Sequence, residues 1–397
     1  MLRAALAFLL SVPVVYAQAL PPGVELGFGG TLHADARTFP DGPVGEAPGF
    51  YLRRVRVEVA VEVAGRFRAV VEPGFGEGEV ELVDGYVEAD LAPALGVRVG
   101  RYKTPVGYES LRSSSDLRFA ERALPTALSP RRDLGAMLAY ETRRVEAQAG
   151  LFNGVPDGSS ASVDWGAGPD AVVRVFGTPL AVGSAAGSVR LGLGVAVAAG
   201  TARGSAGDQL ADYETSGERT FFDYAEGVVP DGRRVRLAPQ ATLDVGRLHV
   251  LGEVLEARHR VVGPGEQGPE SRDLVHRAWQ AAASYVVVGV PRGEERPVPR
   301  RAVTEGGAGA VEVSARVHAL AVDPDAAPLA AAGSARRATA FALAVHWSPV
   351  AEVRIGVTAE RTALDGFSGA GPAAAPPGSG PAPPAETFVV GRLQIDL

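Results

Sequence analysis

The 397-residue sequence contains no cysteine, and this excludes disulfide frameworks and thiol chemistry. Lysine is almost absent as well, because Lys103 is the single lysine and the other basic residues are arginines. No apolar run is long enough for a membrane-spanning helix. The formal net charge of −7 gives a nucleic-acid partner no electrostatic support. These absences exclude disulfide-rich scaffolds and argue against helical membrane proteins and nucleic-acid-binding proteins.

Catalytic and metal-binding signatures are also missing. The histidines are scattered singly, without the paired spacing of metal ligands; they are His33, His249, His259, His276, His318 and His346. Residues 366–370 read GFSGA and fail the last position of a G-x-S-x-G nucleophile elbow, and no glycine-rich phosphate loop ends in lysine. We therefore expect no enzymatic reaction, no metal and no cofactor. A hydrolase at the rim of a barrel is the least supported alternative.

Residues 54–65 carry a regular pattern, RVRVEVAVEVAG. Valines occupy one parity of this segment, and the other parity holds Arg54, Arg56, Glu58, Ala60 and Glu62. Side chains of an extended strand alternate between two faces, so one face here is aliphatic and the other is mostly charged. This length matches a tilted strand that crosses a bilayer. A half-buried strand of a soluble protein is the alternative.

The same period of two recurs along the chain, interrupted by Gly, Pro and Asp. The sixteen predicted strands fall at 24–39, 54–65, 67–71, 80–91, 97–102, 134–140, 145–152, 171–176, 189–199, 235–245, 248–256, 279–287, 311–322, 338–346, 353–359 and 388–397. An even number near sixteen is typical of a pore-forming barrel. The sequence thus predicts an all-β fold, a transmembrane antiparallel β-barrel.

The predicted connections are unequal in length. Short turns are expected at 179–183, 244–247 and 348–351, and long loops at 103–133, 201–234, 256–273, 291–309, 323–337 and 364–386. In outer-membrane barrels the short turns face the periplasm and the long loops face outward. The Ala/Pro/Gly-rich stretch 369–385 is expected to be a mobile outer loop.

The first 17 residues have the form of a secretory signal peptide, with a basic start, a short apolar core and a small-residue site at Ala17. Residues 18–397 would then form one barrel domain, exported to the outer membrane of a Gram-negative-type bacterium. Trp279 and Tyr285 share the apolar parity of one strand and are candidates for the aromatic girdles, with packing at a subunit contact as the alternative.

The polar parity of the predicted strands collects arginines, namely Arg54, Arg56, Arg98, Arg144, Arg190, Arg236, Arg316, Arg354 and Arg392. Charges that face lipid near the midplane cost a few kcal/mol each, so these side chains are expected to line a water-filled lumen. They are candidate anion guides. The alternative is mutual neutralisation by carboxylates on the same face, such as Glu58 and Glu62, and Arg190 lacks a carboxylate two residues away.

Residues 103–133 form a long charged segment in the first third of the chain. Its basic residues, also candidate anion guides, are Lys103, Arg112, Arg118, Arg122, Arg131 and Arg132. A loop at this position is a candidate constriction, because charge clusters at narrow points select ions. A solvated surface loop is the alternative.

Several of these stretches resemble the phosphate- and polyphosphate-selective porin family. The stretches that carry the resemblance are VRVGRYKTPVGYE at 97–109, LRFAERAL at 117–124, SPRRDLG at 129–135, GLFNG at 150–154, DAR at 35–37, FYLRRVR at 50–56, RLAPQ at 236–240, LGE at 251–253, AW at 278–279 and GRLQI at 391–395. Together they extend over nearly the whole mature chain.

The resemblance implies a sixteen-stranded trimeric barrel in the outer membrane, with an inward-folded loop and basic residues that guide anions such as phosphate. Its partners would be membrane lipid, small anions or other solutes, and two further copies. Phosphate-binding members of the family have lysines at the constriction, whereas this chain has only Lys103. The expected function is passive diffusion of small ions and solutes. A non-conducting structural or adhesive barrel is the alternative.

Overall fold

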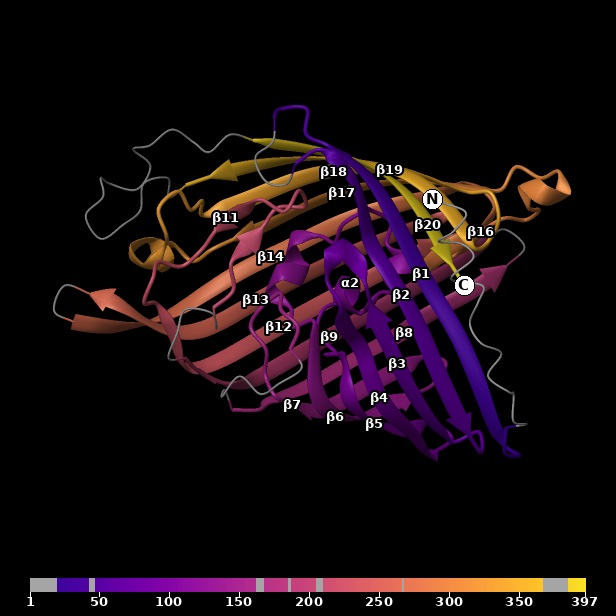
Figure 1. Ribbon diagram of the computed structural model, residues 1–397, viewed down its shortest axis with the longest axis horizontal. Helices are drawn as coiled ribbons and strands as arrows, with labels where there is room; N and C mark the ends of the chain where they lie inside the picture. The colour runs from indigo at the N-terminus through magenta and orange to yellow at the C-terminus, as the bar shows by residue number, and fades with distance from the viewer. Residues whose placement is uncertain are drawn as a thin grey trace.

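The computed structural model describes residues 20–42, 47–161, 168–184, 187–204, 210–265, 268–366 and 385–397. Within these ranges sixteen antiparallel strands form one closed barrel, and β1 pairs with β20 to complete it (Figure 1). The predicted all-β barrel is therefore confirmed. The expected signal peptide, and all of the stretch 369–385 except Ala385, lie outside the described residues.

The barrel strands follow one another around the wall in chain order. They are β1 (Val24–Thr38), β2 (Gly49–Val63), β3 (Phe67–Gly74), β4 (Glu81–Ala92), β5 (Leu95–Lys103), β6 (Arg132–Glu141), β7 (Val145–Phe152), β8 (Asp170–Ser184), β9 (Gly187–Arg203), β12 (Val229–Val245), β13 (Leu248–Gly265), β14 (Gly268–Val288), β17 (Ala310–Ala321), β18 (Arg337–Ser348), β19 (Val353–Asp365) and β20 (Glu386–Asp396).

Shorter elements lie in the connections. Two hairpins form separate sheets, β10 (Tyr213–Glu214) with β11 (Thr220–Phe222) and β15 (Val290–Arg292) with β16 (Glu295–Val298). The described helical turns are η1 (Gly76–Gly78), α2 (Tyr108–Leu111), η2 (Ser114–Asp116), η3 (Leu124–Leu128), η5 (Val303–Glu305) and η6 (Pro324–Leu329). No described helix is long and apolar enough to span a membrane.

Alternation sorts the side chains between the two faces of the wall. In β19, Ile355 and Val357 are exposed on the outer face, whereas Arg354 and Glu360 are buried inside the barrel. An exposed row of aliphatic side chains is stable only against an apolar environment, so the outer face is suited to lipid or to another protein. The charged side chains inside the barrel contact water or one another.

One predicted long loop is wrong, and another lies at the opposite rim from the one expected. Residues 256–273 belong mostly to the extended hairpin of β13 and β14, whose register continues to Gly265 and Gly268 (Figure 1). Their charged side chains read as a loop, but a strand that continues beyond the bilayer meets water and tolerates charge. Residues 291–309 form a long connection, as predicted. They join β14 to β17, however, and therefore lie at the rim of the short turns and not at the rim of the long loops. The predicted turn 179–183 lies within β8.

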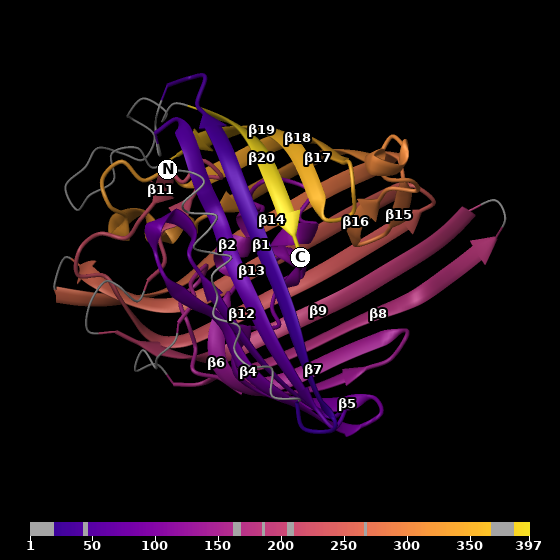
Figure 2. The same ribbon diagram turned by 45° about the vertical axis from the view of Figure 1, so that its right-hand side comes forward.

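The strands differ greatly in length. β3 and β7 have 8 residues each, whereas β13 has 18 and β14 has 21. Figure 2 shows β8 and β9 extending well beyond β7. The barrel therefore has a short wall formed by β3 to β7 and a tall wall formed by β8 to β14.

A buried cluster fills the part of the lumen away from β1 to β4. Val106, Leu124 and Leu128 from the β5–β6 connection pack in this cluster with Phe222 and Leu329 from other connections. The same cluster includes inward side chains of every barrel strand from β5 to β19. Inward side chains of β2, including Arg56 and Glu58, remain partly accessible. Open space within the barrel therefore lies alongside the first strands.

Candidate functional site

The connection between β5 and β6, residues 104–131, lies inside the barrel. Its backbone is held from the far wall: Arg354 donates to the carbonyl oxygen of Leu117 at 2.8 Å, and Ala120 donates its N–H to Thr358 Oγ1 at 3.1 Å. Leu124 N donates to His318 Nδ1 at 3.1 Å. These partners belong to β17 and β19, so the segment crosses the lumen. Buried backbone groups need such partners because unpaired ones are costly.

A cavity of about 520 Å³ lies between this segment and the strands β2 and β5. Its lining holds seven basic and three acidic side chains, namely Arg53, Arg54, Arg56, Lys103, Arg122, Arg131, Arg132, Glu77, Glu79 and Glu81. The structure thus brings six of the sequence-predicted residues together here. The excess of positive charge is local, because the whole chain carries a formal charge of −7.

Two neighbouring cavities share lining residues with this basic cavity. The outer cavity lies toward the long connections, is about 360 Å³ and is lined by four arginines and six carboxylates, which include Asp212, Glu214 and Glu218. The inner cavity lies toward the short turns, is about 560 Å³ and is lined by four basic and four acidic side chains. Along the lumen the charge therefore runs from an acidic outer cavity to a basic central cavity and then to a mixed inner cavity.

Arg53 was missed by strict alternation, which points it outward. The register between β1 and β2 shifts so that His33 pairs with Arg54 and Ala34 pairs with Leu52. This bulge leaves Arg53 as an extra residue, and both arginines point inward. A signal was present in the sequence: the apolar parity is even at Phe50 and Leu52 but odd from Val55 onward. Such a change of parity requires one inserted residue.

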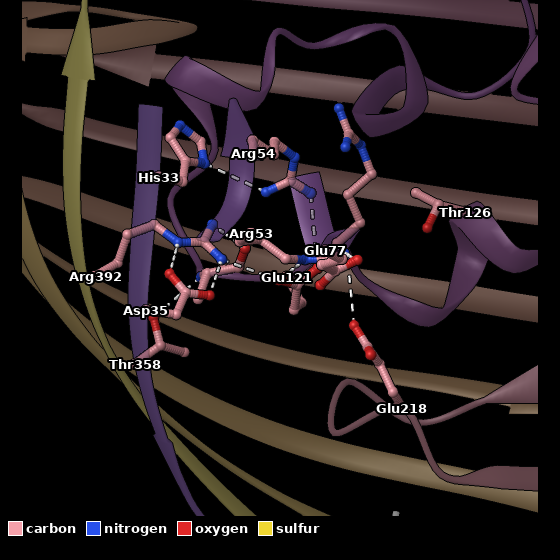
Figure 3. Close-up of polar contacts among 12 residues, drawn as sticks. His33, Asp35, Arg53, Arg54, Glu77, Glu121, Thr126, Glu218, Thr358 and Arg392 are labelled. Carbon is pink, nitrogen blue, oxygen red and sulfur yellow. Dashed lines mark hydrogen bonds and ion pairs between the residues drawn. The ribbon is translucent and has the colours of Figure 1, made fainter. Parts of the chain in front are cut away.

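Glu121 is the centre of an ion-pair network, and it was also missed. Its carboxylate accepts two hydrogen bonds of 3.0 Å from Arg53 and one of 3.0 Å from Arg392, and Arg54 lies 3.8 Å away (Figure 3). Burial alone would raise the pKa of Glu121, but these guanidinium groups outweigh burial and hold it well below its usual range. Arg392 is also bound by Asp35 through two contacts of 2.7 Å.

Lys103, Arg122 and Arg131 line the basic cavity without a carboxylate partner within ion-pair distance among the described residues. Lys103 Nζ donates to the carbonyl oxygens of Leu111 at 3.2 Å and Arg112 at 2.7 Å. Arg122 donates to the carbonyl oxygens of Glu109 at 3.2 Å and Arg112 at 2.7 Å. These carbonyls fix the two side chains but leave their charges uncompensated.

The pKa values of the two loop arginines reflect this surplus of positive charge. Burial, together with Arg131 and Arg132, lowers the pKa of Arg122 to about 10, against the opposing effect of Glu109. Burial and the neighbouring Arg53 lower the pKa of Arg131. A cation that is destabilised by burial and by other cations is stabilised when an anion enters. The cavity is therefore electrostatically prepared for an anion.

The other predicted residues are placed elsewhere, and most of them are neutralised. Their partners are Glu88 for Arg98, Glu294 for Arg112, Glu312 for Arg118 and Arg354, Asp157 and Asp170 for Arg236, Glu109 and Glu360 for Arg316, and Asp35 and Glu121 for Arg392. Within the basic cavity, Arg132 pairs with Asp84 at 2.9 Å and Arg56 pairs loosely with Glu72 at 3.8 Å. Neutralisation, the alternative in the sequence analysis, thus holds for many lumen arginines.

Arg144 and Arg190 lie near short turns and do not line the basic cavity. Arg144 is exposed, and Arg190 donates to Thr178 Oγ1 at 3.4 Å. Among the described residues, no group of three His, Cys, Asp or Glu side chains is arranged to hold a metal ion. Four of the described histidines, His33, His249, His276 and His318, form hydrogen bonds inside the barrel, as His318 does with Glu360 at 3.1 Å.

An aliphatic outer face, a charged interior and an inward-folded segment define the class of porin-like β-barrels. The comparisons identify the family: a model of the phosphate-selective porin O and P family matches residues 26–361. This is most of the chain, and the protein belongs to that family.

Solved structures of outer-membrane channels share the fold. The outer membrane channel DcaP of Acinetobacter baumannii has 13% sequence identity and a TM-score of 0.57, and the alignment covers 94% of this chain and 98% of that chain. The anion-selective porin from Comamonas acidovorans has 13% identity and a TM-score of 0.54, with coverage of 94% and 100%. The trimer form of OmpT from Vibrio cholerae has 13% identity and a TM-score of 0.52, with coverage of 94% and 100%. No curated protein matches the chain.

Proposed function

We propose that this porin is a passive diffusion channel for small ions and solutes that favours anions, with phosphate as a candidate solute. The observation that carries the proposal is the basic cavity, in which Lys103, Arg122 and Arg131 have no carboxylate partner among the described residues. A local excess of fixed positive charge at a narrow point raises the concentration of anions there.

The basic cavity is the proposed control point for passage. The packed cluster includes inward side chains from β5 to β19, the cavity is lined by β2 and β3, and the segment 104–131 borders both. We assign the constriction to this segment on that basis. Arginine binds oxyanions through two parallel N–H groups, so a phosphate in the cavity would be held by Arg122, Arg131 or both.

The proposed setting is the outer membrane, reached with a signal peptide that is cleaved after residue 17. A homotrimer is proposed because β3 and β7 are short. Eight residues at a tilt of about 45° rise roughly 19 Å, which is less than the apolar band of about 25 Å. Contact with two further copies would cover this short wall.

Purified protein in a planar bilayer tests the proposal. Discrete conductance steps are expected, and their absence from correctly folded protein would favour the non-conducting, structural barrel. The reversal potential across a KCl gradient then reports the sign of selectivity, and a preference for chloride over potassium is expected.

Phosphate is tested separately by adding it at millimolar concentration to both sides of the bilayer. A channel that binds phosphate at the basic cavity should show a reduced chloride current, because a bound oxyanion occupies the narrow point. A chloride current that does not respond to phosphate would remove phosphate from the proposal without affecting general anion preference.

A further inference from the structure

The outer face of the tall wall carries a cluster of arginines that the channel does not use. Arg258 of β13 and Arg277 of β14 point away from the lumen, with side chains 62% and 64% exposed. Glu256 lies directly opposite Arg277 in the register and accepts hydrogen bonds from Arg258 Nε at 2.6 Å and from Arg277 Nε at 2.7 Å. One carboxylate is thus shared by two guanidinium groups.

Arg260 extends the cluster on the same face of β13 and is also exposed. A Cβ atom at Gly232 of β12 would lie only 2.9 Å from Cδ of Arg260, so the stem of this arginine lies over the bare backbone of Gly232. Asp273 is opposite Arg260 in the register, but the two do not form an ion pair in this structure. The cluster therefore keeps a net positive charge.

The height of the cluster on the wall matches one membrane surface. Arg258 lies ten residues along β13 from Leu248, and Arg277 lies ten residues along β14 from Val287. At a strand tilt of about 45° these distances correspond to roughly 24 Å, close to the apolar band of about 25 Å. Below the cluster the same face continues with Val254 and Trp279, which are 45% and 43% exposed.

We infer that Arg258, Arg260 and Arg277 bind a phosphate-bearing lipid headgroup of net negative charge in the outer leaflet. The guanidinium groups supply charge-assisted donors for phosphate oxygens, and Glu256 holds two of them side by side. Val254 and Trp279 lie below, where the acyl chains and their interface with the headgroups would be. Apart from residues 289–309, the described connections at the other rim are short, so this rim faces outward in an outer-membrane orientation.

The test uses full-length barrel in a non-ionic detergent and native mass spectrometry with an equal mixture of phosphatidylglycerol and phosphatidylcholine. Wild-type protein should retain phosphatidylglycerol preferentially. Each basic residue near a membrane surface strengthens binding of anionic lipid by about fivefold, so the variant R258Q/R277Q should lower that preference by about 25-fold. The control is R361Q, because Arg361 is an equally exposed arginine, 64%, on the outer face of β19.

Inorganic phosphate provides the second arm of the test. A lipid site should keep its phosphatidylglycerol when millimolar phosphate is added, whereas displacement by free phosphate would overturn the assignment to lipid. Equal retention by wild type and R258Q/R277Q would overturn the site itself, as would an equal loss in R361Q. Single-channel conductance of R258Q/R277Q verifies that the barrel is folded, and it is expected to match wild type because both arginines lie outside the lumen.

Discussion

At the scale of single residues, pairing decides which arginines can act on a passing ion. Arg236 is fully buried and is neutralised by Asp157 at 2.6 Å and Asp170 at 3.0 Å. A buried guanidinium without a partner carries a large desolvation cost, so the packed side of the lumen contains compensated arginines. The uncompensated Arg122 and Arg131 lie where a cavity admits water. The number of lumen arginines therefore overstates the positive charge available to a solute.

Glu121 is expected to limit anion preference, because it neutralises arginines that line the central and outer cavities. The variant Glu121→Gln would leave Arg53 with Glu77 at 2.6 Å and Glu218 at 3.3 Å, but Arg54 would lose its carboxylate neighbour. We expect the chloride-to-potassium permeability ratio to rise by about two- to fivefold. Reversal potentials measure this ratio.

The matched control for that variant is Glu146→Gln, since Glu146 pairs with Arg174 at 2.7 Å but lines none of the three cavities. It should leave the permeability ratio near the wild-type value. An unchanged or lower ratio in Glu121→Gln would show that Glu121 does not limit anion preference.

Acidification is expected to increase anion preference. Burial, Asp212 and Glu218 raise the pKa of the Glu214 carboxyl, so Glu214 takes up its proton at a higher pH than a free glutamate does. The outer cavity then loses negative charge while its arginines stay charged. Reversal potentials recorded from pH 7 to pH 5 should move toward the chloride potential. The variant Glu214→Gln should have a reversal potential closer to the chloride potential at pH 7, and that potential should change less on acidification. A shift of the wild-type reversal potential toward the potassium potential on acidification would contradict this prediction.

At the scale of elements, period-two alternation predicted the strands because side-chain direction in a strand is set locally. Features that depend on pairing with other strands were predicted wrongly for the same reason, because alternation reports only local side-chain direction. The bulge at Arg53 depends on pairing with β1, and residues 256–273 are strand because β13 and β14 continue to pair. The inward path of residues 104–131 depends on partners more than 200 positions away, such as Arg354 for Leu117. Alternation within one strand contains no information on such contacts.

The inward segment should be stabilised by the buried Arg316 of β17. This guanidinium donates to Glu360 at 2.9 Å and to the carbonyl oxygen of Glu121 at 3.1 Å, and it lies 4.3 Å from the ring centroid of Phe119. Arg316→Met leaves Glu360 buried with less compensation, so a loss of about 3–5 kcal/mol is expected. Urea unfolding in detergent measures this change in free energy.

Arg68→Gln is the control for that prediction, because Arg68 and Glu58 form an exposed pair at 3.3 Å, with side chains 48% and 41% accessible. Exposed ion pairs contribute about 0–1 kcal/mol, so unfolding of Arg68→Gln should be nearly unchanged. Equal effects of the two substitutions would show that the contacts of Arg316 do not hold the segment.

At the scale of the whole molecule, the unequal walls connect the fold to assembly. The strands of the tall wall are long enough to cross a bilayer and continue beyond it (Figure 2), whereas we expect the short wall to be covered by protein. The packed cluster includes inward side chains from β5 to β19, so the proposed pore runs beside β1 to β4, next to the short wall. Each pore of a trimer would then lie close to the subunit contacts.

Assembly through the short wall predicts unequal effects of two matched substitutions. Val99 of β5 and Val357 of β19 are both 53% exposed on the outer face. Val99→Gln should shift the protein from trimer toward monomer in native mass spectrometry, because it places an amide in the proposed contact. Val357→Gln should remain trimeric. The opposite result would place the subunit contact at β19.

The central claim is that uncompensated arginines at the basic cavity give the channel its anion preference. The direct test is the reversal potential across a KCl gradient for wild type and for R122Q/R131Q, with R190Q as a control outside the cavity. We expect a potential of anion-selective sign for wild type and R190Q, and a potential near zero or of cation-selective sign for R122Q/R131Q. A cation-selective wild type, or an unchanged potential in R122Q/R131Q, would contradict it.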